Sequence, residues 1–402
     1  MRHFVTLCAI ALLLASCNGQ PPPPPPPPPP ETCDLWSAPD GCECPDGTEV
    51  SNATGLCSPP RVDRLIDWAM AAGGTSFSLA LRDAKFIDEW ARWHRDHGWT
   101  VLRVGAQTSY DWCRAGVGYL PCGPEHGTSE WKENLTRLLD VTARRENVWV
   151  QLIPTFTYKS HNEGSQAANI AYFSKMFDRV NEVVLSGGYK HVIWEAFNEV
   201  VHPLSQHIKD EDVLAIMEHM KENTYLPIGT DYHGGLQEVD REMVSMELSP
   251  DMSFERRFQM SDRLYQNAMR QMEWRGRYPY IWRDIVDYIA FHTSRNPEPT
   301  LDRMREAQAK FKYNKPVLID ETVSWASQEN IDKYGLAGKG TIAMEGHGTE
   351  DERMWQCVKH LKDIHNVKNQ NGLRWRPFYH SIWQIESAKM GRIPTYANDI
   401  EQ

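Results

Sequence analysis

The stretch Val192-Ile193-Trp194-Glu195-Ala196-Phe197-Asn198-Glu199 is a mainly apolar run that ends in polar side chains. A second stretch, Lys315-Pro316-Val317-Leu318-Ile319-Asp320-Glu321, has the same pattern and also finishes on a glutamate. Near-continuous apolar runs of this length are typical of strands that are buried on both faces of a parallel sheet. Barrels built from such strands carry their functional groups at the carboxyl ends of the strands. We therefore expect Glu199 and Glu321 to lie at such ends.

From about residue 62 onward, apolar segments of this kind alternate with segments of helical periodicity. The expected strands are 75–81, 99–104, 148–154, 192–199, 226–230, 285–292, 317–321 and 378–385. The expected helices are 83–98, 128–146, 166–185, 209–223, 300–311 and a segment that opens with a capping box at residue 349 and runs to about residue 364. This alternation predicts an α/β fold, a (β/α)8 TIM barrel. A doubly wound open sheet is the alternative, but no Gly-rich phosphate-binding turn follows the first strand.

The chain leaves little room for an eighth barrel helix, because few residues follow the eighth expected strand. We expect a helix over residues 62–72 to cover that gap from the amino-terminal side.

The first residues predict export. Arg2 and His3 precede an apolar run over residues 4–15, which is too short to remain as a membrane-spanning helix. The run ends in Leu14-Ala15-Ser16-Cys17, which resembles a bacterial lipobox. The resemblance implies a signal peptide over residues 1–16, cleavage before Cys17 and attachment of lipid to its thiol. An ordinary signal peptide with an incidental cysteine is the alternative.

An unbroken run of prolines, Pro21–Pro30, follows the cysteine. Proline cannot continue a helix or a central strand, so the run favours a polyproline II rod of roughly 30 Å. Residues 17–31 are therefore interpreted as a lipid anchor and spacer, with a proline-rich docking motif as the alternative.

Cysteine spacing predicts a small module over residues 32–60, ahead of a barrel domain over residues 61–402. Cys33, Cys42, Cys44 and Cys57 lie in a Gly- and Pro-rich stretch with little periodicity, which favours disulfides of undetermined pairing. Zinc binding is the alternative, but paired C-x-x-C spacing is missing. Cys113 and Cys122 bracket a loop that a further bridge could close, and the remaining cysteine, Cys357, is expected to be buried on a helix.

The composition limits the classes of partner and cofactor that we expect. The 43 Lys+Arg and 54 Asp+Glu give a net charge of −11, which disfavours nucleic acid and anionic membrane surfaces as partners. The 15 histidines include no H-x-H pair and no H-E-x-x-H, so we expect no catalytic metal and no cofactor. We expect a monomer that contacts a membrane through its lipid alone.

Alternation along the fourth expected strand assigns depths to its two glutamates. Glu195 and Glu199 share one strand face, so Glu195 lies deeper if Glu199 points into the barrel mouth. A carboxylate at that depth needs a partner such as an arginine or a hydroxyl.

The segment 194–199 resembles the fourth-strand motif of clan A glycoside hydrolases, and 315–321 resembles their seventh-strand motif. The resemblance implies that Glu199 is the acid/base and Glu321 the nucleophile. It implies substrate-binding roles, more loosely, for Arg103 on the second strand, which would brace the nucleophile and lower its pKa, for His292 on the sixth strand and for Trp383 on the eighth strand. Asn198, beside the acid/base, is positioned to bind a sugar hydroxyl. Family 5-like cellulases and mannanases match best, although the third strand lacks their usual histidine and no tyrosine follows His292.

This resemblance implies a retaining glycoside hydrolase that acts on a β-linked glucan- or mannan-like polysaccharide. Its two carboxyl groups would lie about 5–5.5 Å apart. A surface lipoprotein that binds glycans without cleaving them is the alternative.

Overall fold

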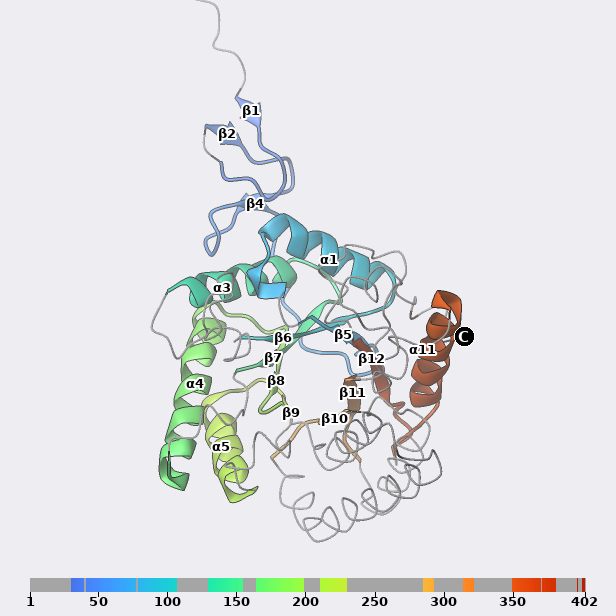
Figure 1. Ribbon diagram of the computed structural model, residues 1–402. Helices are drawn as coiled ribbons and strands as arrows, with labels where there is room; N and C mark the ends of the chain where they lie inside the picture. Colours follow the sequence, from blue (N-terminus) through green and yellow to red (C-terminus); the bar gives the residue numbers. More distant parts are fainter. Residues whose placement is uncertain are drawn as a thin grey trace, which may run out of the picture.

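The computed structural model describes residues 30–39, 41–76, 79–106, 129–154, 164–198, 210–229, 285–292, 314–321, 349–369, 371–380, 396 and 400–401. Within these residues, strands surround a central axis and helices lie outside them (Figure 1). The eight strands are β5 (Gly73–Thr75), β6 (Val101–Gly105), β7 (Trp149–Ile153), β8 (Val192–Glu195), β9 (Ile228–Gly229), β10 (Ile289–His292), β11 (Val317–Glu321) and β12 (Arg376–His380).

All eight strands belong to one sheet with the order β10-β11-β12-β5-β6-β7-β8-β9, and every pair of neighbours is parallel. The two ends of this order meet, because the Asp287 amide donates to the Ile228 carbonyl at 2.7 Å just ahead of β10. The sheet is therefore a nearly closed TIM barrel, as the alternation of the sequence predicted, and the open-sheet alternative is wrong.

The described outer helices are α1 (Ala84–Asp96), α3 (Glu130–Ala143), α4 (Gln166–Ser186), α5 (Asp210–Asn223) and α11 (Glu350–His365). Three of them, α1, α4 and α11, begin at a side-chain cap. Asp83 accepts from the Phe86 amide ahead of α1, and Thr349 forms both bonds of the predicted capping box with Glu352. In the part of the chain that is described, no helix is both long and apolar enough to cross a membrane. The helix expected over 300–311 lies outside the described residues.

Apolar side chains fill the amino-terminal part of the barrel interior. This cluster consists of Ala71, Val101, Trp149, Ile193, Tyr288, Ala290, Leu318 and Phe378. On β6, β7 and β8, the next inward position along each strand is polar: Arg103, Gln151 and Glu195. The barrel therefore has an apolar floor with a polar layer on the side of the strand carboxyl ends.

The first strand is shorter and earlier than expected. It covers Gly73–Thr75, and Leu79–Leu81 form a 3-10 helix, η1, where the sequence predicted strand. A Cβ on Gly73 would lie 2.3 Å from the Val101 carbonyl oxygen, and one on Gly74 would lie 2.3 Å from the Tyr379 ring. Close packing therefore requires glycine at both positions. Because glycine has a low strand propensity, the sequence pattern did not predict a strand there.

The helix expected over residues 62–72 is absent from this described stretch. Residues 61–67 are irregular and residues 68–70 form a turn. Arg64 donates to the carbonyls of Thr142, Ala143 and Val148, and the Trp68 ring lies 5.3 Å from the Tyr288 ring of the barrel floor. The segment is therefore held under the floor by side-chain contacts rather than by helical hydrogen bonds.

The end of the chain occupies the place of the eighth helix instead. Tyr396 and Ile400 are both buried in the main core cluster, and the Tyr396 amide donates to the His97 carbonyl at 2.7 Å. The Tyr396 hydroxyl accepts from Arg376 of β12 at 3.0 Å. These residues thus cover the gap between α1 and β12 that was expected because few residues follow the eighth strand.

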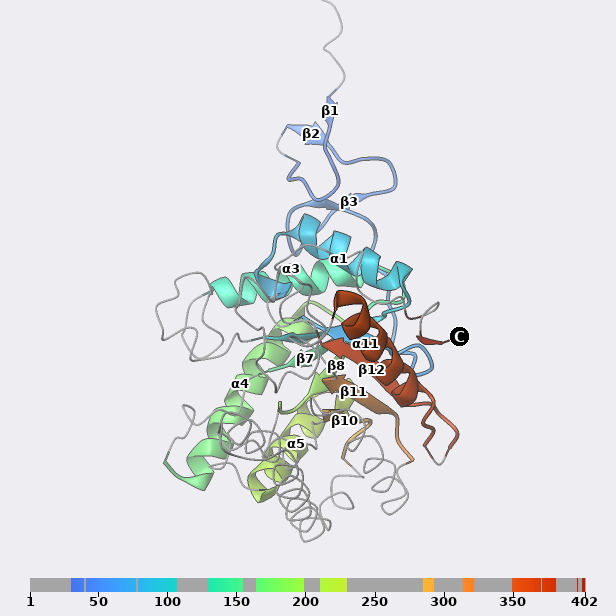
Figure 2. The same cartoon turned by 45° about the vertical axis from the view of Figure 1, so that its right-hand side comes forward.

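A small module precedes the barrel and projects from the side that carries α1 and α3 (Figures 1 and 2). It contains β1 (Glu31–Thr32) and β2 (Cys42–Glu43), which pair in parallel, and β3 (Glu49–Val50) and β4 (Cys57–Ser58), which pair antiparallel. Its disulfides are Cys33–Cys42 and Cys44–Cys57, which settles the pairing and excludes zinc binding by these cysteines. Cys357 is free and buried on α11, as expected, and burial raises its pKa to about 12. The remaining predictions for cysteines concern Cys17, Cys113 and Cys122, which lie outside the described residues.

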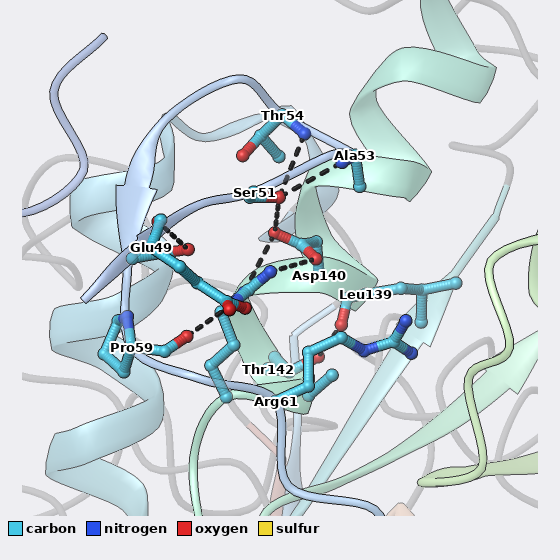
Figure 3. Close-up of polar contacts among 12 residues, drawn as sticks. Glu49, Ser51, Ala53, Thr54, Pro59, Arg61, Leu139, Asp140 and Thr142 are labelled. Carbon is cyan, nitrogen blue, oxygen red and sulfur yellow. Dashed lines mark hydrogen bonds and ion pairs between the residues drawn. The ribbon is translucent and has the colours of Figure 1, made fainter. Parts of the chain in front are cut away.

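The module is fastened to α3 through polar contacts (Figure 3). Ser51 donates to Asp140 at 2.6 Å, and Arg144 binds Asp140 at 3.2 Å and Glu49 at 3.0 Å. Trp36 of the module is buried in the main core cluster of the barrel. The module and the barrel therefore share one core.

Candidate active site

Strand register brings the polar layer of the barrel together. Arg103 on β6 is the direct partner of Gln151 on β7, and Gln151 is the partner of Ile193 on β8. Glu195 lies two residues beyond Ile193 and therefore on the same face of its strand. Three neighbouring strands thus direct an arginine, a glutamine and a glutamate into one layer.

The Glu195 carboxylate accepts hydrogen bonds from side chains of β6 and β7, the two strands that precede β8 in the sheet. Arg103 Nε donates to Glu195 Oε2 at 2.6 Å, and Arg103 Nη2 donates to Oε1 at 2.6 Å. Gln151 Nε2 donates to Oε2 at 2.9 Å. The guanidinium therefore binds the carboxylate in a bidentate geometry, which is the strongest form of this ion pair.

Burial makes this pair sensitive to the loss of either partner. The side chains of Arg103 and Glu195 are both 0% exposed. A charge removed from water at this depth is tolerated only when it is paired and hydrogen-bonded. The partner that the sequence required for a deep Glu195 is therefore Arg103.

Asn198 joins the layer from the segment that follows β8. Its side chain is buried, and its Oδ1 accepts from Arg103 Nη2 at 2.5 Å. The same Nη2 thus bridges Glu195 and Asn198, and the contact directs the amide oxygen of Asn198 toward Arg103. Asn198 is the residue immediately before Glu199, so the network ends next to the predicted acid/base.

Gln151 is the member of this network that the sequence analysis missed. A signal was present, because a glutamine in the middle of the buried run Trp149–Ile153 interrupts an otherwise apolar strand. A polar side chain in such a run must find a partner inside the barrel, and the partner is Glu195.

The predicted nucleophile lies at the end of the seventh barrel strand, counted from β5. The backbone of Glu321 on β11 is in register with His292 on β10, after a register shift that follows the pairing of Phe291 with Ile319. A shift of this kind interrupts the simple alternation of strand faces. The side chains of His292 and Glu321, and the whole of Glu199 and Trp383, lie outside the described residues. Their predicted roles, and the bracing of Glu321 by Arg103, stay predictions.

Among the described residues, no cluster of three or more His, Cys, Asp or Glu side chains has the arrangement of a metal site. The network described above consists of one cation, one anion and two amides, and its members are hydrogen-bonded to one another.

Comparison with known proteins gives similarities in structure only. No family model matches the chain, and no curated protein matches it. A family 5 glycoside hydrolase from Bacteroides vulgatus has a TM-score of 0.43 and 10% identity over 84% of this chain and 63% of its own. An endo-1,4-β-mannanase from Rhizomucor miehei has a TM-score of 0.44 and 11% identity, covering 81% and 94% of the two chains. A β-mannanase from Streptomyces thermolilacinus, solved with mannohexaose, has a TM-score of 0.42 and 12% identity, covering 83% of each chain. This chain spans less than two thirds of the Bacteroides structure, and similarities at this level assign it no substrate.

Proposed function

We propose that this protein is a retaining glycoside hydrolase that cleaves O-glycosidic bonds of a β-linked polysaccharide. The observation that carries the proposal is the buried network of Arg103, Gln151, Glu195 and Asn198, which comes from the second to fourth barrel strands and ends directly before Glu199. Burying charged and polar groups costs stability even when they are paired, so their retention inside a barrel favours a functional role. The second support is Glu321, whose position ends the seventh strand of the same barrel.

The proposed chemistry uses the two terminal glutamates in separate roles. The Glu321 carboxylate attacks the anomeric carbon while the Glu199 carboxylic acid protonates the glycosidic oxygen, so that the carbon–oxygen bond breaks. The Glu199 carboxylate then removes a proton from water, which attacks the same carbon and releases Glu321. Two displacements at one carbon restore its original configuration.

Other predicted residues would bind the sugar. Asn198 would contact a hydroxyl beside the cleaved bond, His292 would lie level with the nucleophile, and Trp383 would form an apolar floor for a sugar ring. We propose a β-1,4-linked glucan or mannan as the substrate, cut at internal bonds.

Release of reducing ends from a panel of soluble β-glucans and mannans tests the activity. We expect wild-type protein to hydrolyse at least one of them, and Glu321→Ala to lose turnover. Azide should restore turnover to Glu321→Ala and give a glycosyl azide of inverted configuration. Asp320→Ala is the matched control, because it removes the neighbouring carboxylate of the same strand. If wild-type protein binds one glycan tightly and cleaves none, it is a binding protein instead. Near-normal activity of Glu321→Ala would show that the nucleophile is assigned wrongly.

We also propose that Cys17 carries lipid and that the proline run holds the barrel away from a bacterial membrane. The support lies in the sequence before the module and in the module itself, whose strand β1 lies far from the barrel (Figures 1 and 2). Cys17→Ser should move the protein from the membrane fraction to the soluble fraction. Unchanged retention in the membrane fraction would contradict the anchor.

A further inference from the structure

The Glu195 side chain is fully buried, and among the described residues Arg103 and Gln151 donate hydrogen bonds to its carboxylate. Its acceptor oxygens bind Arg103 Nε, Arg103 Nη2 and Gln151 Nε2 at 2.6, 2.6 and 2.9 Å. The side chains of Arg103 and Glu195 are fully buried, and Gln151 is 0% exposed. The mechanism proposed above assigns no step to Glu195 or to Gln151.

We propose that Glu195 and Gln151 are positioning residues, which lock the Arg103 guanidinium and through it orient the amide of Asn198. The part of this inference that concerns turnover rests on the proposed function. The chain of contacts begins inside the barrel, at Gln151, and ends at the residue before Glu199.

The contacts explain how such a chain transmits geometry. Two parallel bonds to one carboxylate fix both the position and the plane of a guanidinium. Arg103 Nη2 then binds Asn198 Oδ1 at 2.5 Å, so the plane of the guanidinium sets the direction of the amide. Because the oxygen of Asn198 faces Arg103, its Nδ2 group faces away from Arg103 as a hydrogen-bond donor.

The charges in the network set what each substitution should do. Glu195→Gln keeps the shape but replaces one acceptor oxygen by an NH₂ group, which faces the donors of Arg103 or of Gln151. Gln151→Glu in the same molecule returns one carboxylate to the layer, because Gln151 is the register partner of Arg103. The double variant therefore restores the anion that Arg103 needs, one strand away.

A second buried pair supplies the control. Arg144 binds Asp140 at 3.2 Å, and their side chains are 3% and 1% exposed. This pair lies at the carboxyl end of α3, where Asp140 is in the helix and Arg144 is its C-cap residue, and Asp140 contacts Ser51 of the module (Figure 3). Asp140→Asn therefore removes a carboxylate of similar burial from a place that the proposed chemistry does not use.

Kinetics on the glycan that wild-type protein hydrolyses provide the first readout. We expect Glu195→Gln to lower kcat by about 100-fold with little change in KM, since misplacement of a positioning group by about 1 Å has an effect of this size. The double variant Glu195→Gln with Gln151→Glu should recover about tenfold of this loss, which corresponds to about 1.4 kcal/mol. Asp140→Asn should keep the wild-type kcat. An unchanged kcat in Glu195→Gln, or no recovery in the double variant, would overturn the inference.

Nitrogen-15 NMR of arginine side chains provides a readout that needs no activity. The buried Nε–H of Arg103 should exchange slowly with water, and its resonance is identified by its loss in Arg103→Lys. Exchange should become faster in Glu195→Gln and stay unchanged in Asp140→Asn. Equal exchange in wild type and Glu195→Gln would show that Glu195 does not lock Arg103. A wild-type protein with the slow resonance but no hydrolysis would keep the locked network and contradict the proposed function alone.

Discussion

Two buried arginine–carboxylate pairs in this molecule are alike in chemistry and differ in how the chain brings them together. Arg103 and Glu195 are 92 residues apart and meet inside the barrel. Asp140 of α3 and Arg144, the C-cap residue of that helix, are one helical turn apart and lie against the module. The first pair can form only when β6, β7 and β8 are in register, whereas the second can form in any helix and becomes buried when the module docks.

This difference separates two uses of a buried charge. The pair at the end of α3 is bound by Ser51 and Glu49, so it connects α3 to the module. The pair in the barrel extends to Asn198, at the carboxyl ends of the strands where barrel enzymes carry their active sites. Burial alone therefore does not identify a functional charge, and its position in the fold does.

The largest expected effect comes from removing one partner of each pair. Arg103→Met and Arg144→Met should each lower the free energy of unfolding by about 3–5 kcal/mol, because each leaves a buried carboxylate without its cation. Chemical denaturation measures this loss, and kcat/KM of the folded fraction separates the two pairs. Only Arg103→Met should lose activity. Equal loss of activity in both variants would remove the distinction between them.

Removal of the module's second disulfide should have a smaller effect. It should lower stability where the module contacts α3 and leave activity unchanged. Cys44→Ser with Cys57→Ser should lower the free energy of unfolding by about 2–4 kcal/mol, because the bridge restricts the unfolded chain. The bridge Cys33–Cys42 joins residues 9 apart in place of 13, so its removal is the control and should cost less. Thermal unfolding measures both, and kcat should stay at the wild-type value. A fall in kcat would show that the module influences the barrel interior.

Acid should destabilise the fold as a whole, and with it both pairs, because α1 and α11 contain buried histidines. Burial lowers the pKa of His94 to about 3 and that of His360 to about 3, from 6.5. The unfolded chain binds protons at these positions below pH 6.5 while the folded chain excludes them until about pH 3. Stability is therefore complete above pH 6.5 and falls as the pH decreases toward 3, by about 1.4 kcal/mol per pH unit for each histidine.

Denaturation at pH 7 and pH 5 measures this slope, and His94→Gln should reduce it by one histidine's share. His219→Gln is the control, since His219 is partly exposed and pairs with Asp178 at the surface. A slope that His94→Gln leaves unchanged would contradict this source of acid sensitivity. The two pairs are therefore best compared above pH 6.5.

The sequence predicted those parts of the fold that depend on local pattern. Apolar runs gave the ranks of β8 and β11 as fourth and seventh, and Thr349 and Glu352 gave the start of α11. It failed where tertiary packing overrides pattern: β5 contains two glycines because Val101 and Tyr379 occupy the space of their side chains. The segment 62–72 contains apolar residues, but Ile66, Trp68 and Ala71 pack against the floor of the barrel instead of forming one face of a helix.

The candidate site was predictable to the same extent. Alternation along β8 gave the depth of Glu195 and its need for a partner, but no local rule names a partner 92 residues away. Arg103 was singled out by resemblance and assigned to Glu321, whereas its contacts in the described residues are with Glu195 and Asn198. Gln151 was missed because a single glutamine in an apolar run gains meaning only from its neighbour in the sheet.

Covalent trapping tests the proposed hydrolysis most directly. A 2-deoxy-2-fluoro glycoside with a good leaving group, built on the sugar that wild-type protein hydrolyses, should form a glycosyl-enzyme that hydrolyses slowly. Mass spectrometry of the digested protein should find the added sugar on the peptide that contains Glu321, in wild type and in Asp320→Asn, and not in Glu321→Gln. Label on another carboxylate, or hydrolysis with inversion and no label, would contradict a retaining mechanism with Glu321 as the nucleophile.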